Sequence, residues 1–147
     1  MCSILIMFFK HLIITLIIFF FSSSTCSDLI IEIHNIQKQS GSIHVALYDD
    51  SDDFPKEQGK KLGLKKTINE VLEQGGIIIK NLSPGSYAIA IYHDENDNNR
   101  FDKLLSIPLE KYGFSNDAPV FFGPPSFSDA SFELNKNINS TISIKLR

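Results

Sequence analysis

The chain has 147 residues, which is enough for one domain of ordinary size and too few for two. Its net charge is -3. It carries no basic stripe interleaved with aromatic residues, so nucleic acid is excluded as an expected partner. The two cysteines, Cys2 and Cys26, lie in or beside the N-terminal segment, so the rest of the chain contains no disulfide and must be held together by apolar burial.

The N-terminal segment has the order of regions that is typical of a signal peptide. Lys10 and His11 form a charged flank, residues 12–21 are apolar except for Thr15, and residues 22–27 are small or polar. The apolar run has about ten residues, well short of the roughly 20 that a membrane-crossing helix needs. The pattern therefore predicts cleavage and export.

This pattern divides the chain into a signal peptide over residues 1–26 and a mature domain over residues 27–147. We expect the mature protein to be secreted, periplasmic or held in the cell envelope, with no permanent membrane span. Two alternatives are a retained N-terminal anchor and a lipoprotein acylated at Cys26.

The first element after the signal peptide is a half-buried strand. Leu29, Ile31 and Ile33 alternate with Glu32 and His34, so one face is apolar and the other is polar. Strict alternation of this kind predicts a strand that packs one face on the core.

A second strand follows the turn residues Ser40 and Gly41. Ile43, Val45 and Leu47 alternate with more polar or smaller residues, and we expect this strand to form a hairpin with the first. Residues 49–66, rich in Asp, Lys and Gly, are then expected to form a surface loop with one short helical turn, anchored by its few apolar side chains.

The rest of the chain predicts further short strands and turns. Residues 77–79 and 86–93 are expected strands on either side of a Pro-Gly turn, and residues 138–146 alternate as a closing strand. Residues 107–127 are an irregular region rich in Pro, Gly and Phe. Several short strands without a long helical period predict an all-β fold, a single antiparallel β-sandwich of the immunoglobulin-like or transthyretin-like kind.

Phenylalanines cluster in the Pro-rich half of the domain. They are Phe114, Phe121, Phe122, Phe127 and Phe132. We expect these rings to fill a core region where the backbone is irregular, because aromatic side chains bury large areas. The alternative is an aromatic platform for a ligand.

The strongest local signal is an acidic and amide-rich loop. Asp94, Asn96 and Asn98 place side-chain oxygens at alternate positions, Arg100 can add its backbone carbonyl, and Asp102 adds a second carboxylate. These are positions 1, 3, 5, 7 and 9 of an EF-hand-like calcium loop. Calcium needs such a cluster because it takes six to eight oxygen ligands.

The loop departs from the EF-hand pattern at position 12, where Leu105 replaces the bidentate glutamate. Asn99 stands in place of the usual glycine at position 6 and can do so because Asn tolerates a left-handed backbone. We expect weak calcium binding suited to an extracellular site. The alternative is a solvated, metal-free turn rich in Asn and Asp.

Other candidate sites have less support. His34 and His44 lie on the polar faces of strands expected to be adjacent, but a zinc or copper site there lacks a third ligand. No G-x-S-x-G nucleophile motif is present. His93 and Asp94 are the residues that an enzyme would use if they lined a cleft, and no catalytic or cofactor-binding residue is assigned otherwise.

Several stretches together resemble a known family. They are residues 41–48 (GSIHVALY), 82–89 (LSPGSYAI), 93–98 (HDENDN), 107–116 (IPLEKYGFSN) and 123–127 (GPPSF). In combination they resemble the secreted bacterial family called domain of unknown function 2141. The L-x-P-G-x-Y turn is also similar, more loosely, to transthyretin-like and carboxypeptidase-regulatory-like sandwiches. The resemblance implies an exported domain without an established activity.

These observations lead to one expected function and two alternatives. We expect a non-enzymatic envelope or secreted binding module of unknown ligand, with a calcium-stabilised loop over residues 94–102. The alternatives are a hydrolase or other enzyme that uses His93 and Asp94, and a structural subunit of a surface assembly.

Overall fold

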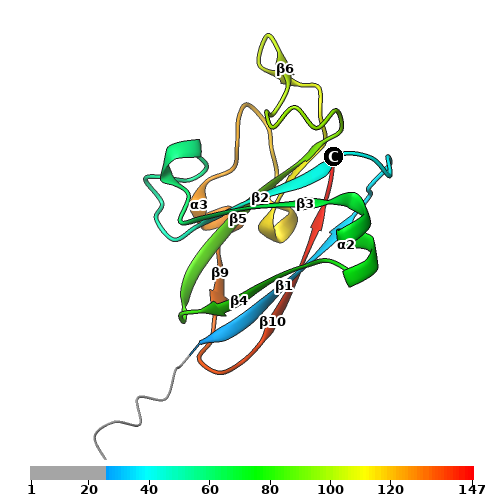
Figure 1. Ribbon diagram of the computed structural model, residues 1–147. Coiled ribbons are helices and arrows are strands. Elements are labelled where there is room, and N and C mark those ends of the chain that lie inside the picture. The colour runs from blue at the N-terminus through cyan, green and yellow to red at the C-terminus, as the bar shows by residue number, and fades with distance from the viewer. Residues whose placement is uncertain (1–25) are drawn as a thin grey trace, which may run out of the picture.

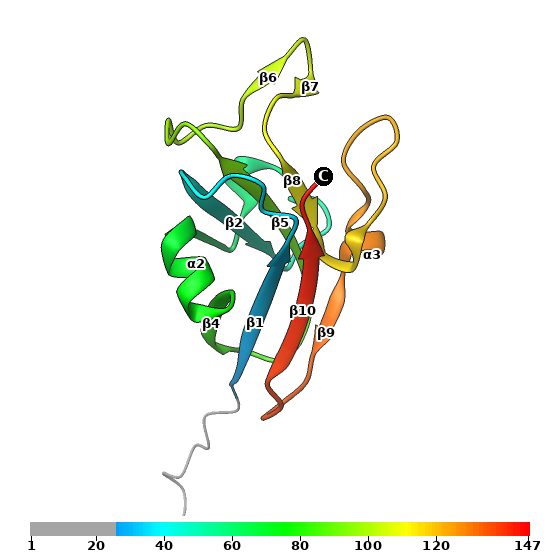
Figure 2. The same ribbon diagram turned by 90° about the vertical axis from the view of Figure 1, so that its right-hand side faces the viewer.

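The computed structural model describes residues 26–147. The expected signal peptide lies outside the described residues except for Cys26. The described part is mostly β, with two larger sheets, one small hairpin and short helices (Figures 1 and 2). Within it, no helix has both the length and the apolar character needed to cross a membrane.

The smaller of the two larger sheets has three strands in the order β10-β1-β4. β1 pairs antiparallel with β4 and parallel with β10, so the first and last strands of the described chain are neighbours (Figure 2). The strands are β1 (Ser27–His34), β4 (Ile77–Leu82) and β10 (Ser140–Lys145).

The other sheet is built around the long strand β5 and follows the order β3-β2-β5-β8, with β9 also paired to β5. All its pairings are antiparallel, and Ser42 at the start of β2 lies opposite Asp94 at the end of β5. The strands are β2 (Ser42–Tyr48), β3 (Leu62–Thr67), β5 (Gly85–Asp94), β8 (Tyr112–Phe114) and β9 (Phe132–Leu134).

The remaining elements are short and connect the strands. Helix α2 leads from β3 in one sheet to β4 in the other and buries Ile68 and Val71. A two-stranded hairpin projects from one end of the molecule (Figure 1). These elements are α2 (Ile68–Gln74), α3 (Phe127–Ala130), the 3-10 turns η1 (Glu57–Gly59) and η2 (Ser115–Asp117), and the hairpin strands β6 (Lys103–Leu104) and β7 (Ile107–Pro108).

The two larger sheets share one hydrophobic core. Leu29 and Ile31 of β1 pack with Ile43 of β2 and Ile89 of β5, and all four side chains are fully buried. This is the alternation predicted from the sequence, and it confirms which face of each strand is apolar. A second, smaller cluster joins Tyr48, Phe54, Ala88, Phe114, Ala118 and Ala130 on the other face of the larger sheet.

Three expectations about the elements are wrong. β1 and β2 do not form a hairpin but lie in different sheets, and the β1–β10 pair is parallel although an antiparallel fold was expected. Residues 49–66 contain the expected helical turn, η1, but also most of strand β3, where Leu62 and Leu64 face inward in alternation. The unforeseen helix α2 begins at a capping box, with Thr67 and Glu70 satisfying each other's backbone N–H groups.

Candidate functional site

The acidic loop follows the last residue of β5 and connects this strand to the projecting hairpin (Figure 2). Asp94 occupies the end of a strand that is paired on both sides, and its side chain is fully buried. A buried carboxylate needs hydrogen-bond donors or a cation around it. The loop supplies such donors from its own backbone.

The carboxylate of Asp94 closes the loop. Its Oδ1 accepts the backbone N–H of Asn98 at 3.0 Å, and its Oδ2 accepts that of Asn99 at 2.7 Å. These donors are positions 5 and 6 of the calcium-loop pattern counted from Asp94. Asn99 has φ 63°, which confirms the left-handed backbone predicted for this residue.

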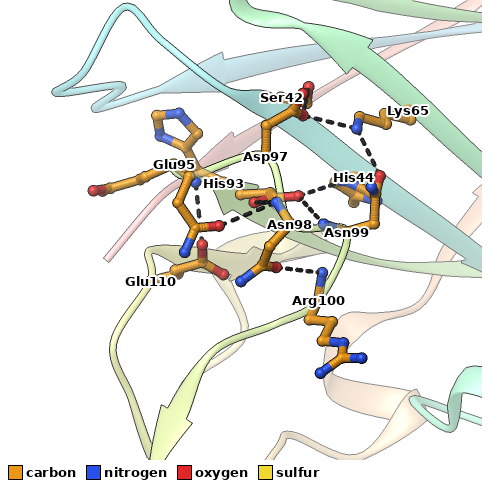
Figure 3. A network of polar contacts seen from close by, with 12 residues as sticks. Ser42, His44, Lys65, His93, Glu95, Asp97, Asn98, Asn99, Arg100 and Glu110 are labelled. Atoms are coloured by element: carbon orange, nitrogen blue, oxygen red, sulfur yellow. Dashed lines mark hydrogen bonds and ion pairs between the residues drawn. The ribbon is translucent and has the colours of Figure 1, made fainter.

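The structure brings the amides of the loop to its second carboxylate. Asn96 and Asn98 each donate from Nδ2 to Oδ2 of Asp102 at 2.9 Å. The Oδ1 of Asn98 accepts the backbone N–H of Arg100 at 2.8 Å, while the Arg100 side chain points away from the network (Figure 3). Hydrogen bonds that involve side chains therefore connect four of the five predicted positions, 94, 96, 98 and 102. The fifth, Arg100, takes part only through its backbone N–H.

Glu110, which follows the loop in the sequence, accepts hydrogen bonds from two of its backbone N–H groups. This largely buried side chain accepts the backbone N–H of Glu95 at Oε1 and that of Asp102 at Oε2, both at 3.1 Å. Burial raises the pKa of Glu110, although the two backbone N–H groups oppose the shift. Because its two oxygens hold both ends of the loop, Glu110 fixes the loop's span.

His44 lies beside Asp94 on the neighbouring strand β2. Its Nε2 is 3.3 Å from Oδ2 of Asp94, but the geometry falls short of a hydrogen bond. The ring stacks on Tyr92 with centroids 4.6 Å apart. Burial lowers the pKa of His44 from 6.5, and Asp94 only partly opposes this shift. Burial therefore favours the neutral imidazole over the imidazolium at this position.

Two acidic side chains on the rim of the loop are paired with lysines. Asp97 contacts Lys65 at 2.7 Å and accepts from Ser42 at 2.8 Å, and these two donors, Lys65 first, lower the pKa of Asp97. Glu95 forms an ion pair with Lys38. Their charges are thus compensated by residues outside the loop, and Figure 3 shows the contact between Lys65 and Asp97.

Gly41 allows the backbone to pass close to Asp94. A Cβ at this position would lie 2.1 Å from the carbonyl oxygen of Asp94, and the residue has φ +80°. Both observations require glycine, because any side chain would push the strand end away. Gly41 therefore fixes where the loop begins.

His93 and Asp94, the residues of the enzyme alternative, do not line a cleft. Both side chains are fully buried, and Asp94 is engaged by its own loop. The Nε2 of His93 lies 2.8 Å from the carbonyl oxygen of Ser40. In this arrangement neither residue can reach a substrate.

The two histidines of the possible zinc or copper pair are not brought together. His34 is in β1 of the three-stranded sheet, while His44 is in β2 of the other sheet. Within residues 26–147, no group of three or more His, Cys, Asp or Glu side chains is arranged to hold a metal ion. Amides and a backbone carbonyl make up three of the five oxygen donors predicted in the acidic loop.

The phenylalanines of the Pro-rich half are divided between core and surface. Phe114 is buried and Phe127 and Phe132 are partly buried, which confirms the packing role for these three. Phe121 and Phe122 are exposed and line an open hollow of about 320 Å³ together with three prolines, Gly123, Ser126 and Asp129. The prediction that all five rings fill the core is wrong for these two.

Sequence reasoning missed several residues that shape the loop. Ser42 and His44 could have been found from the strand pattern, because they alternate with the buried Ile43 and Val45. No spacing in the sequence indicates that Glu110 returns to the loop from the far side of the β6–β7 hairpin. The arrangement brings together two carboxylates and two amides, and their oxygens are donors of the kind that suit a hard cation such as calcium.

The fold and this loop define a mostly β domain with an oxygen-rich loop at one end. Residues 31–143 match the family described as "Uncharacterized protein conserved in bacteria (DUF2141)", and the chain belongs to this family. The match confirms the resemblance found in the sequence and includes the whole acidic loop. No curated protein and no solved structure matches the chain. The family description assigns no activity, so function must be argued from the geometry.

Proposed function

We propose that this protein is an exported, non-enzymatic binding domain of the envelope or the extracellular space. The domain is a single β-sandwich over residues 27–147, and calcium stabilises its acidic loop. The shared core of the two sheets supports the sandwich, and the order of charged, apolar and small residues before residue 27 supports export.

The observation that carries the calcium proposal is the closure of the loop on a buried carboxylate. Asp94 accepts backbone N–H groups from the fifth and sixth loop positions, which folds the chain so that Asn96, Asn98 and Asp102 gather. A cation would replace the amide N–H groups now held by Asp102. Within residues 26–147, no lysine or arginine forms an ion pair with Asp94.

Thermal melting with and without calcium tests this proposal. With a dissociation constant of about 0.3 mM, calcium at about 5 mM adds roughly 1.7 kcal/mol to the free energy of unfolding, because the ion binds only the folded state. The wild-type midpoint should rise by several degrees. Magnesium should raise it much less, since it prefers a rigid octahedron and retains its waters.

Two variants locate the effect. Asp94→Ala should abolish the calcium-dependent gain and also lower the metal-free midpoint, because two loop N–H groups lose their acceptor. Asp102→Ala removes the second carboxylate with less damage to the backbone and should also abolish the gain. Asp52→Ala, a matched change at an exposed residue outside the loop, should keep it. Equal calcium shifts in wild type and Asp102→Ala would refute the metal site.

N-terminal sequencing of the protein recovered from the medium or envelope fraction tests export. The expected result is a chain that begins between about residues 23 and 28, as the position of the small residues predicts. Recovery of an intact Met1 in the membrane pellet would show a retained anchor instead.

A further inference from the structure

The β6–β7 hairpin projects from the end of the molecule that carries the acidic loop (Figures 1 and 2), and most of its exposed side chains are apolar. Leu104 is 61%, Leu105 90% and Ile107 67% exposed, and Leu109 just after the hairpin is 63% exposed. Contiguous exposed apolar side chains of this kind mark interaction surfaces, since isolated surface leucines are common but clusters are not.

The turn of this hairpin is not built for local stability. Leu105 and Ser106 connect β6 and β7 with φ values of 48° and 72°. A two-residue turn with two positive φ values favours Asn-Gly, and a bulky residue in this conformation is uncommon. Leu105 therefore combines an unfavourable backbone conformation with an exposed apolar side chain at the tip, a combination that does not stabilise the domain itself.

A second loop adds apolar side chains at the same end. Residues 118–126 connect η2 to α3 and rise toward the end of the molecule that bears the β6–β7 hairpin (Figures 1 and 2). This loop carries Phe121 and Phe122, which are among the most exposed large apolar residues described. The chain enters the described domain at the opposite end, where β1 begins.

Two exposed cations, Arg100 and Lys103, lie beside the hairpin, and the partly exposed carboxylate of Asp102 stands between them in the sequence. Neither cation is in an ion pair within the described part of the chain. The neighbouring acidic residues Glu95 and Asp97 are neutralised by lysines from elsewhere in the domain. A surface with apolar tips and free cations complements an anionic lipid headgroup layer over an apolar interior.

We propose that this end of the domain binds anionic membranes by inserting the tip of the β6–β7 hairpin and the Phe121–Phe122 loop into the bilayer surface. The hairpin and the Phe121–Phe122 loop are separate projections, so a protein partner would need a matching site for each (Figure 2). A bilayer deforms around both. This proposal rests on the proposed binding role and names its partner, but it does not require calcium.

The chain contains no tryptophan, so single tryptophans can report on each loop. Phe122→Trp and Leu105→Trp place one reporter on each tip, and Ile138→Trp places a control on an exposed residue in the β9–β10 connection at the other end. Each variant is expressed as the full chain, purified, and titrated with phosphatidylcholine vesicles with and without phosphatidylglycerol. Both tip reporters should shift to shorter emission wavelength and be quenched by brominated lipid.

The control and the lipid composition decide the interpretation. Ile138→Trp should show neither change, and the tip signals should require far less anionic than neutral lipid and weaken with salt. Replacing Leu105 and Phe122 together by Asp should reduce vesicle binding about tenfold or more in the same assay, because each buried apolar side chain contributes to insertion. Arg100→Gln with Lys103→Gln should reduce binding to anionic vesicles only.

Three results would overturn the proposal. No shift at either tip, or an equal shift at Ile138→Trp, would exclude insertion through these loops. A shift that depends on protein concentration without vesicles would assign the surface to contacts between copies of the chain. The vesicle titrations are run once with calcium and once with EGTA. If neither condition gives a membrane signal but calcium still raises the melting midpoint, the membrane partner is rejected and the calcium proposal stands.

Discussion

A side chain at Gly41 would clash with Asp94, because a Cβ at this position would lie 2.1 Å from the carbonyl oxygen of Asp94. Gly41→Ala should therefore cost roughly 2 to 5 kcal/mol, from left-handed strain plus displacement of the strand end. Urea denaturation measures this loss. Gly75→Ala is the matched control, with φ +68° but nothing within 4 Å of the added methyl group, and should cost only about 1 kcal/mol. Equal losses would show that the space beside Asp94 is not constrained.

At this scale the sequence predicted the backbone conformation of the loop better than the residues that support it. The left-handed conformation of Asn99 followed from its place in the pattern, because the turn requires a residue that tolerates positive φ. Glu110 could not be predicted, since its role depends on a hairpin that returns it to the loop. Gly41 was recognised as a turn residue, but its contact with Asp94 depends on pairing between β2 and β5.

Helix α2 connects strand β3 of one sheet to strand β4 of the other, and it begins at a capping box formed by Thr67 and Glu70. Glu70 accepts from Lys66 and Thr67, which lower its pKa from 4.5 to about 2. Because the folded pKa is depressed, this contribution to stability is present above about pH 4.5 and is lost as the pH falls toward 2.

Glu70→Gln should remove this part of the pH dependence. Urea midpoints measured at pH 6 and pH 2.5 should differ less in Glu70→Gln than in the wild type. Glu73→Gln, an exposed change in the same helix, should retain the wild-type difference. If Glu70→Gln and Glu73→Gln behave alike, the capping box does not govern acid sensitivity here.

At the scale of elements, alternation predicted faces but not partners. Leu29 and Ile31 are buried as expected, yet the position of β1 between β10 and β4 depends on contacts distant in sequence. The turn residues between β1 and β2 suggested a hairpin. The two strands instead belong to different sheets, which pack on a shared core. The capping pattern of Thr67 and Glu70 is visible in the sequence and could have indicated helix α2.

At the scale of the whole molecule, the candidate binding loops and the start of the described chain lie at opposite ends. The loops proposed to bind calcium and lipid lie at one end, while the described chain starts at the other (Figure 1). A retained anchor or a lipid on Cys26 would therefore hold the apolar loops away from the membrane of attachment. A cleaved, released domain would leave them free to reach any anionic surface. Length and composition predicted one domain, but only the packed sheets show that both loops extend from the same end.

The central claim is that calcium binds within the acidic loop, and a calcium titration followed by backbone amide NMR tests it most directly. We predict saturable shifts at calcium concentrations below about 1 mM. The largest shifts should fall on residues 94–102 and on Glu110, whose carboxylate holds both ends of the loop. Asp102→Ala should remove them. Shifts absent from this loop, or spread over the acidic surface without saturation, would contradict the account.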